Sequence, residues 1–185
     1  MISAGDFRNG MTFEMDGEVY RVVEFQHVKP GKGSAFVRTK YQNIQTGAQM
    51  ERSFNPNEKF EEARLEYRDL EYLYTDGSLY YFMDNETFEQ MPIEPAVLED
   101  ALPYLKENMT CKVISYKGKV YSVEPPINVE LKVTQTDPAV RGNTTNNAMK
   151  NAVLETGVEV KVPLFIDQGE VIRVDTRTGE YLERA

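Results

Sequence analysis

The sequence is poor in the residues that most often carry catalysis or cross-linking: among 185 residues it has one cysteine, one histidine and no tryptophan. The single cysteine, Cys111, cannot form a disulfide within the chain, which is typical of a reducing compartment. The single histidine, His27, excludes a histidine cluster for a metal ion. A Cys–His nucleophilic pair stays formally available, but Cys111 lies in a strand pattern, where a buried and inert thiol is favoured.

Familiar catalytic and cofactor signatures are also missing. There is no phosphate-binding Gly-x-x-x-x-Gly-Lys-Ser/Thr loop, no dinucleotide-binding fingerprint and no Gly-x-Ser-x-Gly elbow. The acidic residues Asp84, Glu86 and Glu89 lie in a turn-like segment, and we expect them to be solvated. We therefore expect no catalytic residue, no metal site and no cofactor, and we do not expect an enzyme.

Long apolar segments are absent as well. No stretch approaches the roughly 20 apolar residues that a membrane-spanning helix needs. Residues 1–6 do not combine a basic region with an apolar run, as secretory leaders do. We therefore expect a cytoplasmic protein without a membrane partner.

Charge is abundant but unevenly placed. Acidic residues outnumber basic residues 30 to 21, which gives a net charge of −9 and disfavours nonspecific binding of nucleic acid. Residues 1–64 hold 9 basic and 9 acidic residues, residues 65–127 carry −7, and residues 128–185 carry −2. The first block is therefore the one best suited to approach RNA or DNA.

Breaks in the sequence predict three domains. Pro125 and Pro126 form a strong break, because paired prolines end strands and stiffen connections. A softer break lies near residues 63–65. We therefore place the domains at residues 1–64, 65–127 and 128–185.

Short strands dominate within these blocks. Alternating or β-branched runs predict hairpins and strands over residues 18–41, 71–83, 110–123, 158–166 and 171–182. Only residues 95–102, which end near Pro103, favour a helix. Many short strands at close spacing are typical of small barrels. We predict an all-β fold with three small β-barrel domains in series.

The hairpin of the first block carries a lysine, Lys32, at its tip. Pro30, Gly31, Gly33 and Ser34 surround it, which is the composition of a tight connection, and we expect both glycines to adopt positive φ. Residues 25–50 contain no acid, and the basic residues of this window all lie on the hairpin: Lys29, Lys32, Arg38 and Lys40. Such a window fits either a solvated hairpin or a positive probe aimed at phosphates.

Two further features stay open to more than one reading. Residues 136–147 form a polar loop that is too long for a simple turn, so it is either a binding loop, in which Arg141 could meet phosphate, or a tolerant surface loop. Aromatic residues are concentrated in the second block, where core packing and subunit or domain contact are favoured over base stacking because the block is acidic. These residues are Tyr72, Tyr74, Tyr80, Tyr81, Phe82 and Phe88.

Motifs from all three blocks resemble bacterial elongation factor P. In the first block the similar segment is Lys29-Pro-Gly-Lys-Gly-Ser-Ala-Phe-Val-Arg38. In the second block it is Tyr74-Thr-Asp-Gly with Tyr81-Phe-Met-Asp84 and on through Glu89-Gln90. In the third block it is Thr136-Asp-Pro-Ala-Val-Arg-Gly-Asn-Thr-Thr145, followed by Val160-Lys-Val-Pro-Leu-Phe165 and Gly179-Glu-Tyr181. The resemblance covers essentially the whole chain.

This resemblance implies both a fold and a function. The family has a KOW/SH3-like barrel followed by two OB-fold barrels, in an L-shaped arrangement that mimics tRNA. Its members bind both ribosomal subunits between the peptidyl (P) and exit (E) sites, contact the P-site peptidyl-tRNA and relieve stalling at consecutive prolines. The position of Lys32 matches the lysine that enters the peptidyl transferase centre, which a lysine-modifying enzyme extends in many members.

The resemblance also implies further contacts. Lys29, Arg38 and Lys40 would meet tRNA phosphates. The third-domain loop would face the small subunit and the E-site codon through Arg141, Gly142, Asn143 and Thr144. We expect a monomer.

Some positions depart from the pattern. Ser34 stands where other members often carry Gln, and Asn143 stands where many have Asp. Alternatives to the elongation factor are a paralogous elongation factor P-like protein with another stalling-motif preference, a generic OB-fold single-strand binder, and an enzyme.

Overall fold

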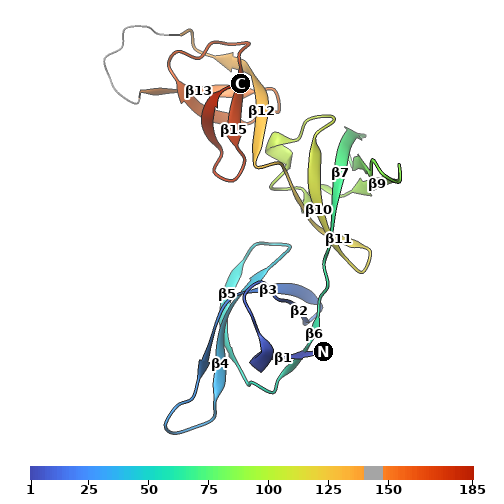
Figure 1. Ribbon diagram of the computed structural model, residues 1–185. Coiled ribbons are helices and arrows are strands. Elements are labelled where there is room, and N and C mark those ends of the chain that lie inside the picture. The colour runs from blue at the N-terminus through green and yellow to red at the C-terminus, as the bar shows by residue number, and fades with distance from the viewer. Residues whose placement is uncertain (140–147) are drawn as a thin grey trace. The chain divides into compact units, whose positions relative to one another are not determined.

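The computed structural model describes residues 1–139 and 148–185, and almost all of its regular structure is β (Figure 1). The strands form three curled sheets, which confirms the all-β, barrel-like fold predicted from the sequence. The first sheet has the order β1 (Ile2–Ser3), β6 (Lys59–Glu62), β2 (Thr12–Met15), β3 (Glu18–Val28), β4 (Phe36–Asn43) and β5 (Gln49–Phe54).

The other two sheets each have five strands. The second has the order β11 (Lys119–Glu124), β10 (Thr110–Tyr116), β7 (Glu66–Thr75), β8 (Tyr80–Met83) and β9 (Gln90–Ile93). The third has the order β14 (Glu159–Pro163), β13 (Met149–Leu154), β12 (Asn128–Thr136), β15 (Val171–Asp175) and β16 (Glu180–Arg184). The hairpins predicted over residues 71–83, 110–123 and 171–182 are confirmed.

The helix predicted over residues 95–102 is wrong. Helical structure in the described residues consists of three-residue 3₁₀ turns: η1 (Ala4–Asp6), η2 (Pro95–Val97) and η3 (Leu102–Tyr104). The Leu98 amide donates to the carbonyl of Pro95 at 3.0 Å, and the Ala101 amide donates to that of Leu98 at 2.8 Å. A segment this short between two prolines cannot propagate an α-helix, and burial of Leu98 and Ala101 fixes it as turns instead.

The chain forms two compact units. One comprises residues 1–67 with residues 114–122, and the other comprises residues 68–113 with residues 123–185. The first unit therefore includes the tip of the β10–β11 hairpin, whereas the second includes most of the second sheet and all of the third. The domain boundaries at 64/65 and 127/128 stay a prediction.

Aromatic rings build the core of the first sheet. Phe7 stacks on Phe13 with ring centroids 5.0 Å apart, and Phe54 meets Phe60 edge-on at 5.3 Å. All four side chains are buried. Such ring pairs stabilise a core beyond the effect of their buried area, so this cluster gives the β3–β4 hairpin a firm base.

The tip of the β10–β11 hairpin packs within the first unit. Tyr116 and Tyr121 share a buried cluster with Val19 of β3. The Tyr116 hydroxyl donates a hydrogen bond to Glu14 Oε2 at 3.0 Å, and Lys117 Nζ lies 3.7 Å from the same oxygen. Apolar packing and charge together therefore hold the hairpin tip.

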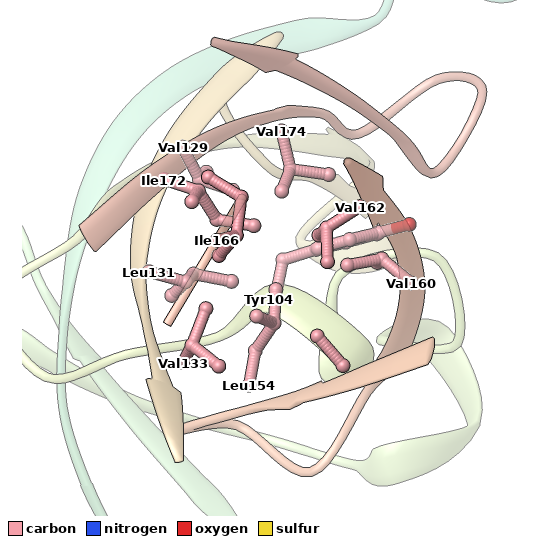
Figure 2. Packing of buried hydrophobic residues seen from close by; sticks show 11 residues of the cluster. Tyr104, Val129, Leu131, Val133, Leu154, Val160, Val162, Ile166, Ile172 and Val174 are labelled. Atoms are coloured by element: carbon pink, nitrogen blue, oxygen red, sulfur yellow. The ribbon is translucent and has the colours of Figure 1, made fainter. Parts of the chain in front are cut away.

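The core of the third sheet contains a residue from earlier in the chain. Aliphatic side chains from β12 to β15 fill most of it, and Tyr104 from η3 projects among them (Figure 2). The Thr156 hydroxyl donates to the carbonyl of Pro103 at 2.5 Å, and Lys106 Nζ lies 3.1 Å from Glu155 Oε1. The segment around Tyr104 therefore completes a barrel whose strands begin only at Asn128.

Candidate nucleic-acid-binding hairpin

The β3–β4 hairpin projects from the rest of its sheet (Figure 1). Its strands pair antiparallel as far as Val28 opposite Phe36, and residues 29–35 connect them. Every residue of this connection is exposed. Val37 and Thr39 of β4 are fully buried, so the stem is anchored while the connection stays in solvent.

Lys32 lies at the tip and is exposed, as predicted. Within residues 1–139 and 148–185, neither Lys32 nor Lys29 has an ion pair or a side-chain hydrogen bond. Both ammonium groups are thus available to an anionic partner. A free, flexible lysine that is not buried also suits a reaction at its amine.

The two glycines beside Lys32 differ in conformation. Gly33 has φ +104°, a region that residues with a side chain rarely adopt, so glycine is required there. Gly31 does not adopt positive φ, so the expectation of positive φ was right only for Gly33. A Cβ at Gly33 would lie 3.9 Å from Pro30 Cγ, which is an ordinary contact distance and not a clash. The requirement for glycine at this position therefore comes from the backbone conformation and not from lack of space.

The two other basic residues of the hairpin are paired with acids. Lys40 Nζ lies 3.4 Å from Glu24 Oε2, and Arg38 Nε lies 3.8 Å from Glu51 Oε1. The cause is strand register: Lys40 sits opposite Glu24 on β3 and opposite Glu51 on β5. Residues 25–50 contain no acid, but strand pairing places the two flanking acids, Glu24 and Glu51, beside Lys40 and Arg38.

These pairs frame a small surface pocket on the first sheet, of about 190 Å³. Phe25 lines it, packs edge-on against His27 at 5.7 Å between ring centroids, and has the Arg8 guanidinium 5.7 Å from its ring centre. This mixed-charge surface was not predicted from the sequence. The alternation of Glu24, Phe25 and Gln26 along β3 was the available signal, because register brings such residues opposite a basic strand.

The predicted contact residues of the third-domain loop are Arg141, Gly142, Asn143 and Thr144, and they lie outside the described residues. The chain is described again from Ala148. At Ala139, the last described residue before this segment, the backbone amide donates a hydrogen bond to Asp167 Oδ1 at 2.9 Å. Lys150 Nζ donates to the carbonyl of Asp137 at 2.5 Å.

The aromatic residues of the second block divide into two groups. Tyr72 and Phe82 are buried, as the core-packing interpretation requires. Tyr74 stacks on Tyr81 with centroids 4.7 Å apart, yet Tyr74 is 47% exposed, and Phe88 is 72% exposed. Core packing therefore accounts for Tyr72 and Phe82, and for Tyr74 and Phe88 a subunit or domain contact stays a prediction.

Asp84 is more constrained than a solvated turn residue. Its Oδ2 accepts a hydrogen bond from Arg68 Nη2 at 2.7 Å, and its Oδ1 accepts one from the Glu86 amide at 2.8 Å. These bonds, that of Arg68 first, hold the pKa of Asp84 below its usual value. The expectation of a solvated carboxylate was therefore wrong for Asp84, because the turn folds it onto Arg68.

Cys111 is buried, as predicted, with 1% of its surface exposed. Burial raises the pKa of its thiol to about 12, so the reactive thiolate is strongly disfavoured. No group of three or more histidine, cysteine or acidic residues in the described part of the chain could hold a metal ion. No helix among the described residues has the length and apolar character to cross a membrane.

Family models match three successive segments of the chain. They are described as Elongation factor P (EF-P) KOW-like domain over residues 3–60, Elongation factor P (EF-P) OB domain over residues 65–123, and Elongation factor P, C-terminal over residues 129–184. The KOW-like assignment of the first domain and the OB assignment of the second domain agree with these models.

Curated relatives match along their full length. Elongation factor P of Acetivibrio thermocellus is 59% identical over 184 residues, with 100% of both chains covered. Elongation factor P of Clostridium botulinum (strain Hall) is 60% identical over 184 residues, again with 100% of both chains covered.

A solved structure described as eukaryotic translation initiation factor 5A from Methanococcus jannaschii has a similar fold, with a TM-score of 0.51 and 22% identity. The match covers 66% of this chain and 94% of that one. From the three family models and the full-length relatives together, this chain belongs to the bacterial elongation factor P family and is a translation elongation factor that acts on the ribosome.

Proposed function

We propose that the protein binds the ribosome between the P and E sites and stimulates peptide-bond formation at consecutive prolines. Lys32 would act there by positioning the CCA end of the P-site peptidyl-tRNA. The observation that carries this proposal is the placement of Lys32 at the exposed end of an anchored hairpin, without an ion pair or side-chain hydrogen bond to any described residue.

The proposed mechanism needs no acid, base or metal. Proline is a constrained participant in peptide transfer, so misplacement of the peptidyl-tRNA contributes strongly to the barrier. Holding the reacting groups in a productive geometry lowers the entropic part of such a barrier. An ammonium group placed beside the CCA backbone adds charge-assisted hydrogen bonds. Lys32 would therefore act on the rate more than on affinity.

Affinity for tRNA would come from the remaining basic residues of the hairpin. Lys29 has no ion pair with the described residues and could contact phosphate directly. Arg38 and Lys40 would exchange their acidic partners for phosphates, which costs little because exposed ion pairs are weak. The loop with Arg141, Gly142, Asn143 and Thr144 would contact the small subunit.

Modification of Lys32 by a lysine-modifying enzyme fits the same geometry. All residues from Lys29 to Ala35 are exposed, so an enzyme can reach the amine without unfolding the stem. A longer side chain would extend the reach of the hairpin toward the CCA end. Intact mass and peptide mapping of natively expressed protein would test this, with added mass on Lys32 as the expected result.

The decisive experiment compares Lys32→Ala with Lys29→Ala in translation of a polyproline message and in ribosome binding. We expect Lys32→Ala to remove most of the stimulation with little loss of binding, and Lys29→Ala mainly to weaken binding. Abolished binding in Lys32→Ala would contradict this division of roles. Relief of stalling at other motifs, with none at prolines, would instead support a paralogous elongation factor P-like protein.

A further inference from the structure

An open cavity of about 670 Å³ lies in the second unit, away from the Lys32 hairpin in sequence. Its walls are largely apolar and include Pro103, Tyr104, Pro125 and Ile127. Ile127 is 55% exposed, so its side chain offers apolar surface that a ligand could bury. The volume lies within the range of about 300–1,000 Å³ that is typical of binding pockets.

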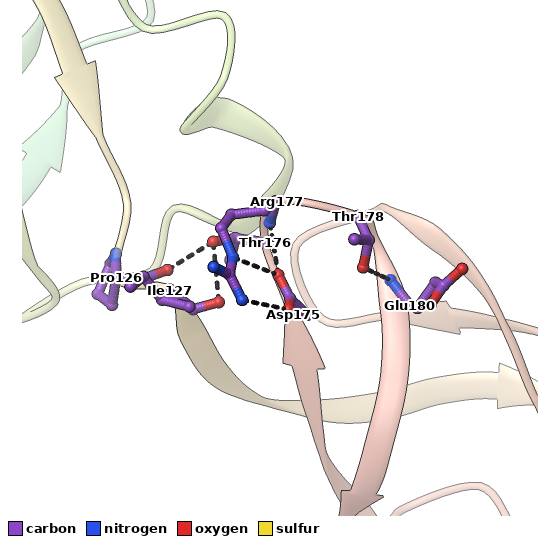
Figure 3. A network of polar contacts seen from close by, with 7 residues as sticks. All are labelled: Pro126, Ile127, Asp175, Thr176, Arg177, Thr178 and Glu180. Carbon is purple, nitrogen blue, oxygen red and sulfur yellow. Dashed lines mark hydrogen bonds and ion pairs between the residues drawn. The ribbon is translucent and has the colours of Figure 1, made fainter.

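The walls of this cavity are held in place. Tyr104 is buried in the core of the third sheet, and the carbonyl of Pro103 accepts a hydrogen bond from the hydroxyl of Thr156. Elsewhere along the lining, the Thr176 hydroxyl donates a hydrogen bond to the carbonyl of Pro126 at 2.6 Å, and the Thr176 amide donates one to the carbonyl of Ile127 at 2.8 Å (Figure 3). A ligand would therefore meet a preformed pocket and would pay little for ordering it.

The polar residues of the lining are mostly acidic. Glu99, Asp100 and Glu124 are exposed and have no ion pair or side-chain hydrogen bond with the described residues. Arg177 is the basic residue of the lining, but Asp175 holds its guanidinium, with Nη2 at 3.0 Å and Nε at 3.3 Å (Figure 3). Because this pair is internally neutral, the three free carboxylates set the charge of the cavity.

We propose that this cavity binds a basic protein segment, which places an aliphatic side chain between the proline walls and lysine or arginine side chains against the three carboxylates. The apolar walls call for an aliphatic anchor, since burying Ile127 and Pro125 removes exposed apolar surface. The carboxylates repel phosphates and attract cations, so charge complementarity favours a basic protein over a nucleic acid.

The test uses an unlabelled peptide, acetyl-Lys-Lys-Leu-Lys-Leu-Lys-Lys-amide, titrated into the full chain at physiological ionic strength and followed by amide NMR shifts. We expect saturable shifts concentrated at the amides of residues 99–102, 104, 124, 127 and 176–177, since proline has no amide N–H. Replacing both leucines of the peptide by serine, or all its lysines by glutamate, should weaken binding about tenfold or more. Equal binding of either control peptide, or no saturation, would overturn the proposal.

A pair of matched variants separates the cavity from the general acidity of the chain. E99Q/D100N/E124Q removes three carboxylates from the cavity, and D69N/E86Q/E159Q removes three exposed carboxylates elsewhere, so both change the net charge from −9 to −6. We expect about tenfold weaker binding for the first and nearly unchanged binding for the second. Equal loss in both would show attraction by net charge alone and would overturn the proposal. The assay contains no ribosome, so its outcome is independent of the role proposed for Lys32.

Discussion

Gly179, in the turn between β15 and β16, lies directly against the hydroxyl of Tyr104. A Cβ at Gly179 would be 3.2 Å from Tyr104 Oη, and the residue has φ +74°. Both constraints call for glycine. The glycine of the Gly-Glu-Tyr motif at residues 179–181 is therefore explained by Tyr104, which lies 75 positions earlier in the chain.

We expect Gly179→Ala to destabilise the third sheet by two additive effects. Left-handed backbone costs a residue with Cβ about 1–2 kcal/mol, and crowding of Tyr104 adds about 1–3 kcal/mol. Gly157→Ala is the matched control, because Gly157 has φ +90° but nothing within 4 Å of its Cβ position. The loss of stability in each of the two variants is measured by hydrogen exchange of the β12 and β15 amides. An equal loss of stability in the two variants would contradict the crowding effect, because it would show that the Tyr104 side chain shifts aside without cost.

A double variant checks the same contact independently. Tyr104→Phe removes the hydroxyl but keeps the ring in the core. It should recover most of the extra cost of Gly179→Ala, since neighbouring substitutions in contact are not additive. If Tyr104→Phe leaves that extra cost unchanged, the destabilisation comes from the backbone alone.

Local patterns in the sequence were enough to predict the strands, but not the long-range packing. Alternation and turn residues identified the hairpins because strand pairing between neighbours depends on local periodicity. Tyr104 lies before the Pro125-Pro126 break, and nothing in its local pattern predicts that it packs in the core of the third sheet. The short segment of residues 95–102 was misread for the related reason that burial, not propensity, determines its form.

The Lys32 tip was predictable, whereas the partners of Arg38 and Lys40 were not. Pro-Gly-Lys-Gly indicates an exposed connection by composition alone. The pairs with Glu24 and Glu51 depend on the register of three strands, which includes an irregularity between Val22 and Glu24. A shift by one residue would turn these side chains to the other face, so the pairing could not be read from sequence.

Tyr116→Phe should loosen the tip of the β10–β11 hairpin. The change removes the hydrogen bond from the hydroxyl to Glu14, at a cost of about 1 kcal/mol. Hydrogen exchange at residues 117–119 should become severalfold faster. Tyr121→Phe is the control, because Tyr121 lies in the same buried cluster but its hydroxyl has no hydrogen bond with the described residues. Similar acceleration in both variants would argue that ring packing, not the hydrogen bond, holds the tip.

Cys111 should resist alkylation in the folded protein. Burial raises its thiol pKa to about 12, against about 8.5 for a free thiol, so at pH 8 the reaction should be about a thousandfold slower than in urea. Because the folded pKa is raised, the stabilisation linked to this thiol is present below pH 8.5 and is lost as pH rises toward 12. Iodoacetamide labelling followed by mass spectrometry measures the rates. Comparable rates in the native and unfolded chain would mean that the site opens readily.

Glu24→Gln should strengthen ribosome binding if Lys40 contacts tRNA phosphate as proposed. The substitution removes the Glu24 carboxylate that lies 3.4 Å from Lys40 Nζ. Lys40 then no longer has to break an ion pair with Glu24 before it contacts a phosphate. We expect a few-fold gain in affinity for the ribosome. The slope of log affinity against log salt concentration should also steepen, by up to about the amount that one additional phosphate contact contributes. Glu86→Gln is the control, since it makes the same change in net charge at an exposed residue of the second sheet's unit. If Glu24→Gln binds no better than Glu86→Gln across a salt series, Lys40 stays paired with Glu24 in the complex and the phosphate contacts must come from Lys29 and Arg38.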